Sequence, residues 1–430
     1  MEPSTNNFLY PEDGHASSSE LSMTARVLNI IRNEREISRT DIARIVDGSR
    51  SAVVQHVERL LSYGLIREVG VAASTGGRRA RVLALNGNAG YIAGVDHGAT
   101  SIDVAITNLA GEILSHISDE ADVSEGPERC LSRARDMIKR SLDNAHISHE
   151  RLWAIGIGMP GPVEFKTGRP VAPPIMPGWD GYPVREYFAP SFTCPVYVDN
   201  DVNVMAIGEQ WTGLGHGIEN FLFIKVGTGI GCGIVCHGQL YRGADGCAGD
   251  IGHIQVNGQT VICRCGNLGC LEAVAAAPAW VRMAHEAANR STLIADHLTR
   301  HNTLTAKDVS DFAGRGDHTC VEIIQKSGRY IGHILAGLVN FFNPSLIVIG
   351  GDVSKTGDVW LAAIRQEIYR RSLPLGSRNL LVQRSQLRDL AGVIGATAFA
   401  VQQLFSEEGL SRLLHQITQP GAVIEMSESS

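Results

Sequence analysis

Apolar residues between positions 21 and 64 recur at intervals of three and four, which is the period of amphipathic helices. Ser38, with Asp41 three residues later, is typical of a capping box and predicts that a second helix begins there. A third helix is expected to begin at Ser49 or Ser51. The expected core positions are Ile42, Ala43 and Ile45 on the second helix and Val53, Val57, Leu60 and Leu61 on the third. Three short helices with a tight turn between the last two predict a helix-turn-helix.

Two β-rich runs follow at 65–69 and 79–85, and a glycine-containing tip at 73–77 separates them. This pattern predicts a hairpin. Arg78 and Arg79 stand beside the tip, and a basic hairpin next to a helix-turn-helix is a wing that can reach phosphates or the minor groove. The candidate DNA contacts are Arg50, Ser51, Gln55 and His56, which we place off the core stripe of the third helix, together with Arg78 and Arg79. The alternative for each is an ordinary solvated surface position.

Charge supports the same interpretation. The chain of 430 residues carries a formal net charge of −7, yet residues 21–85 contain eleven arginines and six acidic residues, a net charge of +5. A basic module on an acidic chain favours contact with double-stranded DNA confined to one end. Residues 1–20 are rich in Ser, Asn, Pro and Gly, so we expect a disordered tail there.

Beyond residue 89 the pattern changes to short apolar strands alternating with helical stretches. The runs 91–95 and 101–108 flank a turn that contains Asp96, Gly98 and Thr100, and the run 221–235 repeats this arrangement around Gly227, Thr228 and Gly229. An apolar strand at 346–349 then ends in Gly350 and Gly351. Such strand ends expose backbone N–H groups where α/β sheets bind phosphate. We therefore expect a duplicated α/β fold around a cleft.

A polar cluster follows the apolar run 196–198, and it comprises Asp199, Asn200, Asp201 and Asn203. Carboxylates and carboxamides suit hydroxyl-rich ligands, because each hydroxyl both donates and accepts a hydrogen bond. Asp201 could also accept the proton of an attacking hydroxyl. The alternative is an Asx-rich turn at a strand end.

The spacing H-x9-C-x-C-x4-C joins His253 to Cys263, Cys265 and Cys270. One imidazole and three thiolates suit a closed tetrahedral site, so we predict structural Zn²⁺. Cys263 and Cys265 would share one face of an extended strand, and Gly266, Asn267 and Gly269 would let the chain turn so that Cys270 completes the set. The alternative is a glycine-rich loop with free or disulfide-bonded cysteines. Asp250 and Glu272 flank the loop.

Nine cysteines without a signal peptide predict a reducing, cytoplasmic location. The most apolar long window, 331–350, is interrupted by polar residues and proline, so we expect no membrane span. Long apolar helices are expected at 321–342 and 390–405, in the core or at an oligomer interface, and a short amphipathic segment at 410–417 precedes a polar tail.

Together, Pro160-Gly161, Asn200-Asp201, Gly227-Thr228-Gly229 and the cysteine motif through Glu272 resemble the ROK family of repressors, open reading frames and kinases. The resemblance is to its repressor branch. It implies a tail at 1–20, a winged helix-turn-helix at 21–88, a two-lobed actin-like sugar-kinase fold of class α/β at 89–408, and a tail at 409–430.

The resemblance also implies roles for individual residues. The residues that contact a sugar would be Asn200, Asp201, Asp250, His253 and Glu272, and Asp201 would be the catalytic base of a kinase. The first phosphate turn would contain Asp96, Gly98 and Thr100, and the second Gly227, Thr228 and Gly229. Gly350 and Gly351 would lie near adenosine.

Three departures from the family pattern put catalysis in doubt. Family kinases usually read Asp-x-Gly-Gly-Thr-Lys in the first turn, whereas Ala99 and Ser101 stand here in place of the second glycine and the lysine. Asp250 replaces the usual glutamate, and the Pro-Pro-Asn segment reads Pro-Pro-Ile at 173–175. The first two changes weaken a phosphate cradle or shift a sugar contact.

The leading hypothesis is therefore a sugar-responsive transcriptional regulator, expected to be a repressor that binds operator DNA as a homodimer or homotetramer. The alternative is an ATP-dependent kinase of a hexose or N-acetylhexosamine that also binds DNA, and only this alternative requires ATP and Mg²⁺. A third hypothesis, in which the metal itself is the signal, requires reversible metal loss.

Overall fold

The computed structural model describes residues 18–71 and 81–418 and divides into two compact units. Unit 1 contains the N-terminal residues through Gly90, residues 108–110, and the C-terminal residues from Val401 onward. Unit 2 contains residues 91–107 and 111–400. The first boundary lies two residues from the one expected at 88, whereas the C-terminal boundary falls at 400 instead of 408.

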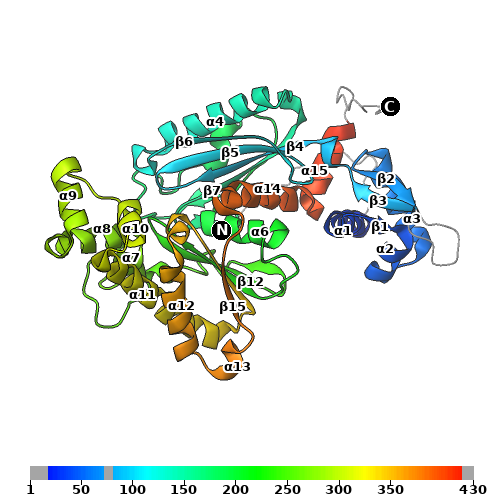
Figure 1. The fold of residues 1–430 in the computed structure, drawn as a ribbon. Coiled ribbons are helices and arrows are strands. Elements are labelled where there is room, and N and C mark those ends of the chain that lie inside the picture. Colours follow the sequence, from blue (N-terminus) through cyan, green and yellow to red (C-terminus); the bar gives the residue numbers. More distant parts are fainter. Residues whose placement is uncertain (1–17, 72–80, 419–430) are drawn as a thin grey trace, which may run out of the picture. The chain divides into compact units, whose positions relative to one another are not determined.

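Unit 1 contains the predicted helix-turn-helix and wing (Figure 1). Its helices are α1 (Ser18–Glu34), α2 (Arg39–Val46) and α3 (Arg50–Ser62), and its sheet has the strand order β1 (Ile37–Ser38), β3 (Arg81–Leu85), β2 (Ile66–Val71). Ser38 caps α2, because its hydroxyl accepts a hydrogen bond from the Asp41 backbone N–H at 3.2 Å. Ser49 caps α3 in the same way through Ala52. The wing tip, with Arg78 and Arg79, lies outside the described residues.

One expected core position is wrong. Ile45 is exposed, and Val46 is buried in its place together with Ile42 and Ala43. Helix α2 is only two turns long, and its buried face follows the spacing i, i+1, i+4 from Ile42 instead of continuing to Ile45.

The C-terminal helix α15 (Glu407–Thr418) belongs to unit 1, where it packs against α1. It covers the amphipathic segment that we expected at 410–417. Leu410, Leu413 and Leu414 are buried. The Asn29 side chain of α1 donates a hydrogen bond to the Phe405 carbonyl oxygen at 2.9 Å, just before α15 begins. The two ends of the chain therefore form one folded unit.

Unit 2 contains two five-stranded sheets with the same topology (Figure 1). The first has the order β10 (Val196–Asn200), β7 (Leu152–Met159), β4 (Tyr91–His97), β5 (Ser101–Asn108), β6 (Ile113–Glu120). The second has the order β13 (Gln239–Tyr241), β12 (Ile230–Cys236), β11 (Phe221–Val226), β14 (Leu346–Gly350), β15 (Leu381–Arg384). In each, three consecutive strands form a meander. A later strand pairs in parallel with the first strand of the meander, and the last strand pairs in parallel with that later one. This repetition confirms the expected duplication.

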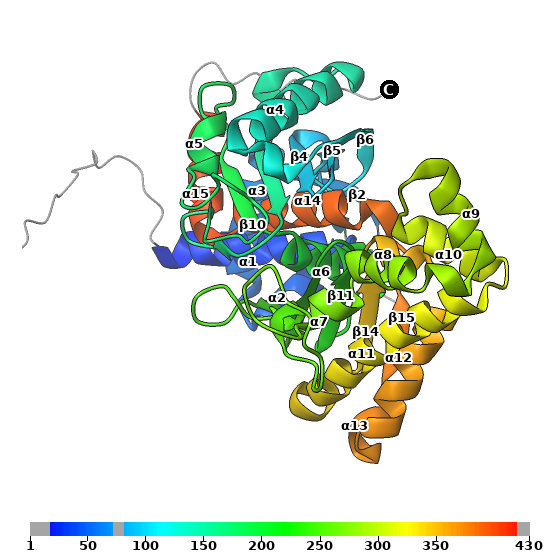
Figure 2. The same cartoon turned by 90° about the vertical axis from the view of Figure 1, so that its left-hand side faces the viewer.

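In chain order, the helices of unit 2 occupy matching places in the two halves. Figure 2 shows α4 beside the sheet of β4, β5 and β6, and α11 and α12 beside β14 and β15. The first half contains α4 (Pro127–Asn144), α5 (Val184–Phe188) and α6 (Asp201–Thr212), and a short hairpin, β8 (Val163–Glu164) and β9 (Arg169–Pro170). The second contains α11 (His318–Phe342), α12 (Asp358–Arg371), α13 (Pro374–Ser377) and α14 (Ala391–Leu404). An insertion before α11 adds α7 (Leu271–Ala275), α8 (Ala277–Glu286), α9 (Thr292–His301) and α10 (Ala306–Gly314).

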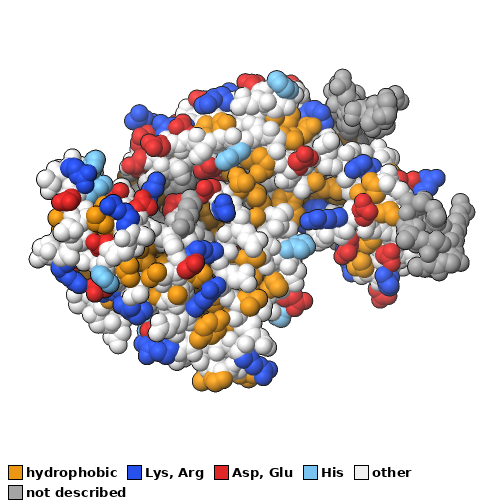
Figure 3. Space-filling view, in the orientation of Figure 1, with side chains coloured by type: hydrophobic (Ala, Val, Ile, Leu, Met, Phe, Trp, Pro, Cys, Tyr) orange, Lys and Arg blue, Asp and Glu red, His pale blue; other side chains and the backbone are white. Residues whose placement is uncertain are grey.

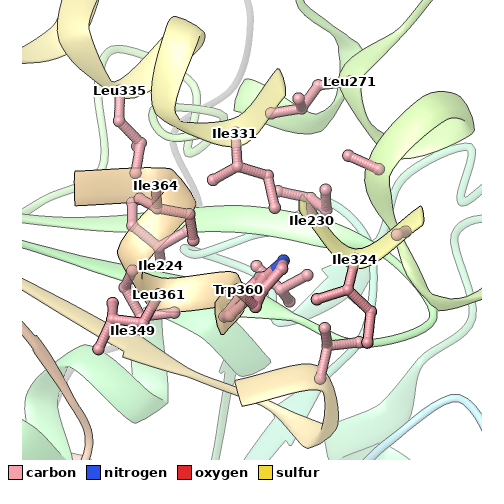
Figure 4. Packing of buried hydrophobic residues seen from close by; sticks show 14 of the residues in the cluster. Ile224, Ile230, Leu271, Ile324, Ile331, Leu335, Ile349, Trp360, Leu361 and Ile364 are labelled. Atoms are coloured by element: carbon pink, nitrogen blue, oxygen red, sulfur yellow. The ribbon is translucent and has the colours of Figure 1, made fainter. Parts of the chain in front are cut away.

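The largest core of unit 2 lies between the second sheet and α11 and α12 (Figure 4). Ile224 and Ile349 project from the sheet, and Ile331, Trp360 and Ile364 meet them from the helices. The two helices approach closely, because a Cβ atom on Gly332 would lie 2.6 Å from the Ile364 carbonyl oxygen. The expected helix at 321–342 is thus confirmed as a core element. Among the described residues, no helix has the length and apolarity that crossing a membrane requires.

Helices α6 and α14 also meet through glycines. A Cβ atom on Gly395 of α14 would lie 2.0 Å from the Val204 carbonyl oxygen of α6, and one on Gly208 would lie 2.8 Å from the Ala391 carbonyl oxygen. Neither position has room for a larger residue. Since α6 begins within the polar cluster, at Asp201, this packing fixes the position of that cluster.

We expect Leu413→Ala to destabilise unit 1 by about 2–5 kcal/mol, because it leaves a cavity beside α1. Hydrogen–deuterium exchange of the full-length protein should show faster exchange in α1 and α15 and unchanged exchange in the sheets of unit 2. Arg412→Ala is the matched control, since Arg412 is exposed on the same helix and pairs with Glu408. Unchanged protection of α1 in Leu413→Ala would show that α15 does not support the helix.

Candidate functional site

The predicted polar cluster forms where β10 ends and α6 begins. Asn200 is the N-cap of α6, since its Oδ1 accepts hydrogen bonds from the Val202 and Asn203 backbone N–H groups at 3.0 and 3.2 Å. Its Nδ2 donates to the Gly161 carbonyl oxygen at 2.9 Å. Asn200 therefore ties the Pro160-Gly161 segment to α6. Asp201, the first residue of α6, is buried.

Asp201 has a charged partner, Lys225, that the sequence motifs did not single out. The Lys225 ammonium of β11 donates a hydrogen bond to Asp201 Oδ2. Burial acts to lower the pKa of Lys225, but the carboxylates of Asp201 and Asp96 outweigh it, so the pKa lies above its ordinary value. The available signal was a lysine within the otherwise apolar strand Phe-Leu-Phe-Ile-Lys-Val. An ion such as this is rare inside an apolar strand unless it is paired.

The two predicted phosphate turns occupy equivalent places in the repeat, between β4 and β5 and between β11 and β12. In the first, the Gly98 backbone N–H donates to the Ser101 carbonyl oxygen at 2.8 Å. Asp96 is buried at the end of β4, and burial raises its pKa to about 7 even though Lys225 opposes the rise. Thr100 is exposed.

In the second turn, the Gly227 backbone N–H donates to the Gly229 carbonyl oxygen at 3.0 Å. Gly350 ends β14, and Gly351 has a φ of 86°, a conformation that favours glycine. Asp352 then approaches Gly227 from the β14 side. The structure thus brings the predicted adenosine-side glycines together with the second turn.

Glu272 meets the start of β12 from helix α7. Its Oε2 accepts a hydrogen bond from the Ile230 backbone N–H at 3.2 Å, and a Cβ atom on Gly229 would lie 2.7 Å from that oxygen. Burial raises the pKa of Glu272, and the Ile230 hydrogen bond opposes the rise. On the α6 side of β12, Gly231 lies against Val202, the residue after Asp201. Glu272 and Asp201 therefore approach the same end of β12 from different helices.

His253 joins the two predicted sites. Its Nδ1 lies 3.7 Å from Cys263 Sγ, whereas its Nε2 lies 3.9 Å from an Asp250 carboxylate oxygen. The two ring nitrogens face different neighbours, so one nitrogen can bind a metal while the other remains available to a polar ligand. Asp250 is exposed, so its carboxylate is accessible.

The four predicted metal ligands are brought together. The donor atoms of His253, Cys263, Cys265 and Cys270 all lie within 4.8 Å of one another. The Sγ atoms of Cys265 and Cys270 are 3.7 Å apart. A tetrahedral ion with bonds of about 2.3 Å to sulfur requires about 3.8 Å between two sulfurs. All four residues therefore fit one tetrahedral ion, and the three cysteines are free of disulfides.

The local backbone around these cysteines differs from our expectation. Cys263 and Cys265 do not share a face of a strand, because residues 264 and 265 form a turn. The Gly266 backbone N–H closes this turn by donating a hydrogen bond to the Cys263 carbonyl oxygen at 2.9 Å. The Cys263 backbone N–H donates to the Asn267 carbonyl oxygen at 2.8 Å. A hydrogen bond from the Asn267 backbone N–H lowers the pKa of Cys265 to about 7, which favours the thiolate that a metal binds.

The predicted DNA contacts on α3 are only partly exposed. Arg50, Ser51 and Gln55 are exposed, but His56 is buried and its Nδ1 lies 2.9 Å from Thr24 Oγ1 of α1. Our placement of His56 off the core stripe is therefore wrong. Val54, which the apolar pattern did not single out as a surface position, is exposed next to Gln55 in the chain, and its methyl groups suit contact with a thymine methyl group.

Comparison with known proteins yields a family and two kinds of relative. The ROK family profile matches residues 92–403. A xylose repressor of Caldicellulosiruptor bescii is 32% identical over 383 residues, which cover 88% of this chain and 95% of that protein. A glucokinase of Halalkalibacterium halodurans is 36% identical over 321 residues, which cover 74% of this chain and 97% of that protein. The kinase is thus matched almost completely but leaves about a quarter of this chain without a counterpart.

A solved structure resembles nearly the whole chain. It is the crystal structure of a ROK family transcriptional regulator described as a homologue of the E. coli MLC protein. The TM-score is 0.79 at 27% sequence identity, and the match covers 93% of this chain and 99% of the other. The likeness extends beyond the residues that the family profile covers. The chain therefore belongs to the ROK family and has its actin-like fold with an additional N-terminal module.

Proposed function

We propose that this protein is a sugar-responsive transcriptional regulator in which unit 1 binds operator DNA and unit 2 binds a sugar. The observation that carries the proposal is the presence, on one chain, of a helix-turn-helix with a hairpin and of a polar site at the start of β12. The similarity to the xylose repressor covers 88% of this chain and therefore includes both parts. The similarity to the glucokinase covers 321 residues, which is close to the length of the segment 92–403 that the ROK family profile matches.

The DNA contacts would come from the exposed side of α3 and from the wing. Arg50 and Gln55 carry side chains that read guanine and adenine, and Ser51 can bind phosphate or a base. Ser51 Oγ lies 3.1 Å from Ser49 Oγ at the start of the helix, so its position is supported by the N-cap. Arg78 and Arg79 remain predicted wing contacts.

The sugar contacts would come from Asp201, Glu272, His253, Asp250 and Asn200. Carboxylate oxygens accept hydrogen bonds from sugar hydroxyls, and the imidazole N–H donates one. Asn200 Oδ1 already accepts two hydrogen bonds and Nδ2 donates one, so Asn200 would contribute through the second N–H of its amide nitrogen. This set favours a neutral, hydroxyl-rich ligand over an anionic one, because Asp201, Asp250 and Glu272 would repel negative charge.

The tetrahedral cluster would hold structural Zn²⁺, with His253, Cys263, Cys265 and Cys270 as ligands. Bound zinc would fix the rotation of the His253 ring through its Nδ1, which lies on the cysteine side. The metal would therefore organise the sugar site without taking part in a reaction. Nine free cysteines among the described residues support a reducing, cytoplasmic location.

An apolar tip supports a two-fold oligomer. We define it as Phe341 at the end of α11 together with Leu373 and Leu375 beside and within α13, which are 89%, 68% and 74% exposed. The Leu373 backbone N–H donates to Asn340 Oδ1 at 3.0 Å, so the two parts are adjacent. Figure 3 shows hydrophobic side chains gathered over α13 at the lower end of the view. Such exposed apolar clusters mark interaction sites.

Helix α14 would connect sugar binding to DNA binding. Residues 391–400 of this helix belong to unit 2, where Gly395 packs on α6, and residues 401–404 belong to unit 1. A sugar that moves Asp201 and α6 would therefore move a helix that continues into the DNA-binding unit. The effect on DNA requires that the sugar bind the two states with different affinity.

The alternative, a sugar kinase, is supported by the position of Asp201. It begins a helix at a strand end, where a general base could accept a proton from a sugar hydroxyl. Against it stand the altered first turn and the Lys225 partner of Asp201. We therefore propose binding without phosphoryl transfer, so that ATP and Mg²⁺ are not required.

The direct test measures DNA affinity by fluorescence anisotropy, with DNA selected by the protein from a random library, against pentoses, hexoses and N-acetylhexosamines. We expect one sugar to change DNA affinity by about tenfold or more, a typical coupling of about 1–3 kcal/mol. Asp201→Asn should retain DNA binding and need a sugar concentration about tenfold higher, since one hydrogen bond to a charge is lost. The regulator proposal fails if every sugar leaves DNA affinity unchanged.

Metal content tests the proposed zinc site. We expect one zinc ion per chain by mass spectrometry in the native protein and none in Cys263→Ser, which should also lose the sugar response because the His253 ring is no longer fixed. Cys247→Ser is the control, since Cys247 is an exposed free thiol outside the cluster. Full zinc content in Cys263→Ser would rule out the assigned ligand set.

Sedimentation tests the oligomer. We expect Leu375→Asp to weaken self-association by about tenfold or more, because a charge would be buried without a partner in the interface. Leu114→Asp in β6 is the control, as Leu114 is an exposed leucine far from α13 in the sequence. If Leu375→Asp has the same molecular mass as the native oligomer at low protein concentration, the interface does not include the apolar tip.

A further inference from the structure

Lys225 continues the buried face of a strand that packs on α6. Side chains alternate along β11, so Phe221, Phe223 and Lys225 project to the same face. The two phenylalanines are buried in one cluster with Val202 and Met205 of α6. The pattern of this face predicts an apolar residue at position 225, but the chain has a lysine there. The Lys225 ammonium donates a hydrogen bond to Asp201, the first residue of α6. The placement of Lys225 is therefore fixed by strand register and not by a mobile loop.

The Lys225 ammonium interacts electrostatically with three carboxylates that different elements contribute. Asp201 accepts its hydrogen bond, and Asp96 at the end of β4 and Asp352 after β14 attract it electrostatically. Asp96 is only 9% exposed, and within the described residues its Oδ1 has no hydrogen-bond partner. Buried carboxylates require a nearby cation or hydrogen-bond donors. Lys225 supplies that cation from within the chain.

We propose that the Lys225 ammonium is the permanent counter-cation of the carboxylate cluster formed by Asp96, Asp201 and Asp352, in the place where phosphoryl transfer would need a divalent cation. The site is thereby committed to binding a sugar without transferring phosphate to it. This inference deepens the proposed regulatory function, because it gives the reason why a kinase-like site acts as a sensor.

Two physical consequences follow. A divalent cation in this cluster would stand close to a fixed positive charge, and the repulsion opposes its binding. A carboxylate that already accepts a hydrogen bond from an ammonium group is also a weaker acceptor for a hydroxyl proton, although it can still accept a hydrogen bond from that hydroxyl. The residues here therefore do not fit a complex of Mg²⁺ and ATP, and Ala99 and Ser101 in the first turn agree with this.

Binding of Mn²⁺ alone, followed by electron paramagnetic resonance on the full-length, zinc-loaded protein, tests the inference. We expect no Mn²⁺ bound by the native protein at submillimolar concentration. Lys225→Met, which keeps the unbranched shape and most of the length of the side chain without its charge, should bind one Mn²⁺ at least about tenfold more tightly than the native protein. Asp96→Asn in that background should abolish the gained binding.

Three further variants separate charge from packing. Lys225→Gln removes the charge but keeps a hydrogen-bond donor for Asp201, and it replaces Lys225→Met in the experiment if that variant does not fold. Lys225→Arg keeps the charge and should bind no Mn²⁺. Arg242→Met is the matched control, because Arg242 pairs with the neighbouring Asp199 at 2.8 Å and its removal also deletes one cation. It should gain no Mn²⁺ binding.

Mn²⁺ bound by the native protein, or no gain in a folded Lys225→Gln protein, overturns the inference. A second result also overturns the inference: the native protein releases ADP when sugar and ATP are present, and Lys225→Met abolishes this release. Lys225 would then be a catalytic residue. The Mn²⁺ measurement uses neither sugar nor DNA. If no sugar changes the DNA affinity of the native protein, the regulator proposal fails, but the Mn²⁺ result for Lys225 is unaffected. If instead the Mn²⁺ result contradicts the role of Lys225, the regulator proposal is unaffected.

Discussion

The close packing of α6 is the constraint on which the rest of unit 2 depends. Its N-terminal turn lies on Gly231 and Gly233 of β12, and its middle meets Gly395 of α14, each at a distance that leaves no room for a Cβ atom. These contacts hold Asn200 and Asp201 at the end of the first sheet and against the second. Because protein interiors are tightly packed and resist compression, a small shift of α6 must be taken up by α14.

Charge in the interior follows from the same arrangement. Bringing the ends of β4, β10 and β14 together gathers Asp96, Asp201 and Asp352, and such a cluster is unfavourable without a cation. A metal-dependent enzyme can meet this requirement with an ion that arrives with its nucleotide. Here β11 contributes Lys225, and Asp199 next to Asp201 is matched by Arg242. The two adjacent carboxylates of β10 and α6 thus each have a basic partner from the second half of the duplicated fold.

The local signals in the sequence were reliable where they depended on near neighbours. Ser38 and Ser49 cap their helices because an N-cap needs only a hydroxyl and the next turn of backbone. The predicted metal ligands come together as their spacing indicated, although a turn and not a strand places two of them: His253, Cys263, Cys265 and Cys270. The burial of His56 does not follow from near neighbours, because it depends on Thr24 of α1, which is distant in the sequence.

The sequence by itself determined the class of each part: a basic helix-turn-helix with a hairpin, a duplicated α/β fold with glycine-bearing strand ends, and a cluster of one histidine and three cysteines whose donor atoms could hold a metal ion. These follow from periodicity, charge and spacing, which are properties of short segments. Only the tertiary structure decided that α15 folds with α1, that His56 is a core residue, and that Lys225 pairs with Asp201 across 24 residues. Each of these depends on which surfaces bury one another, and the pattern within a single segment does not specify its partner.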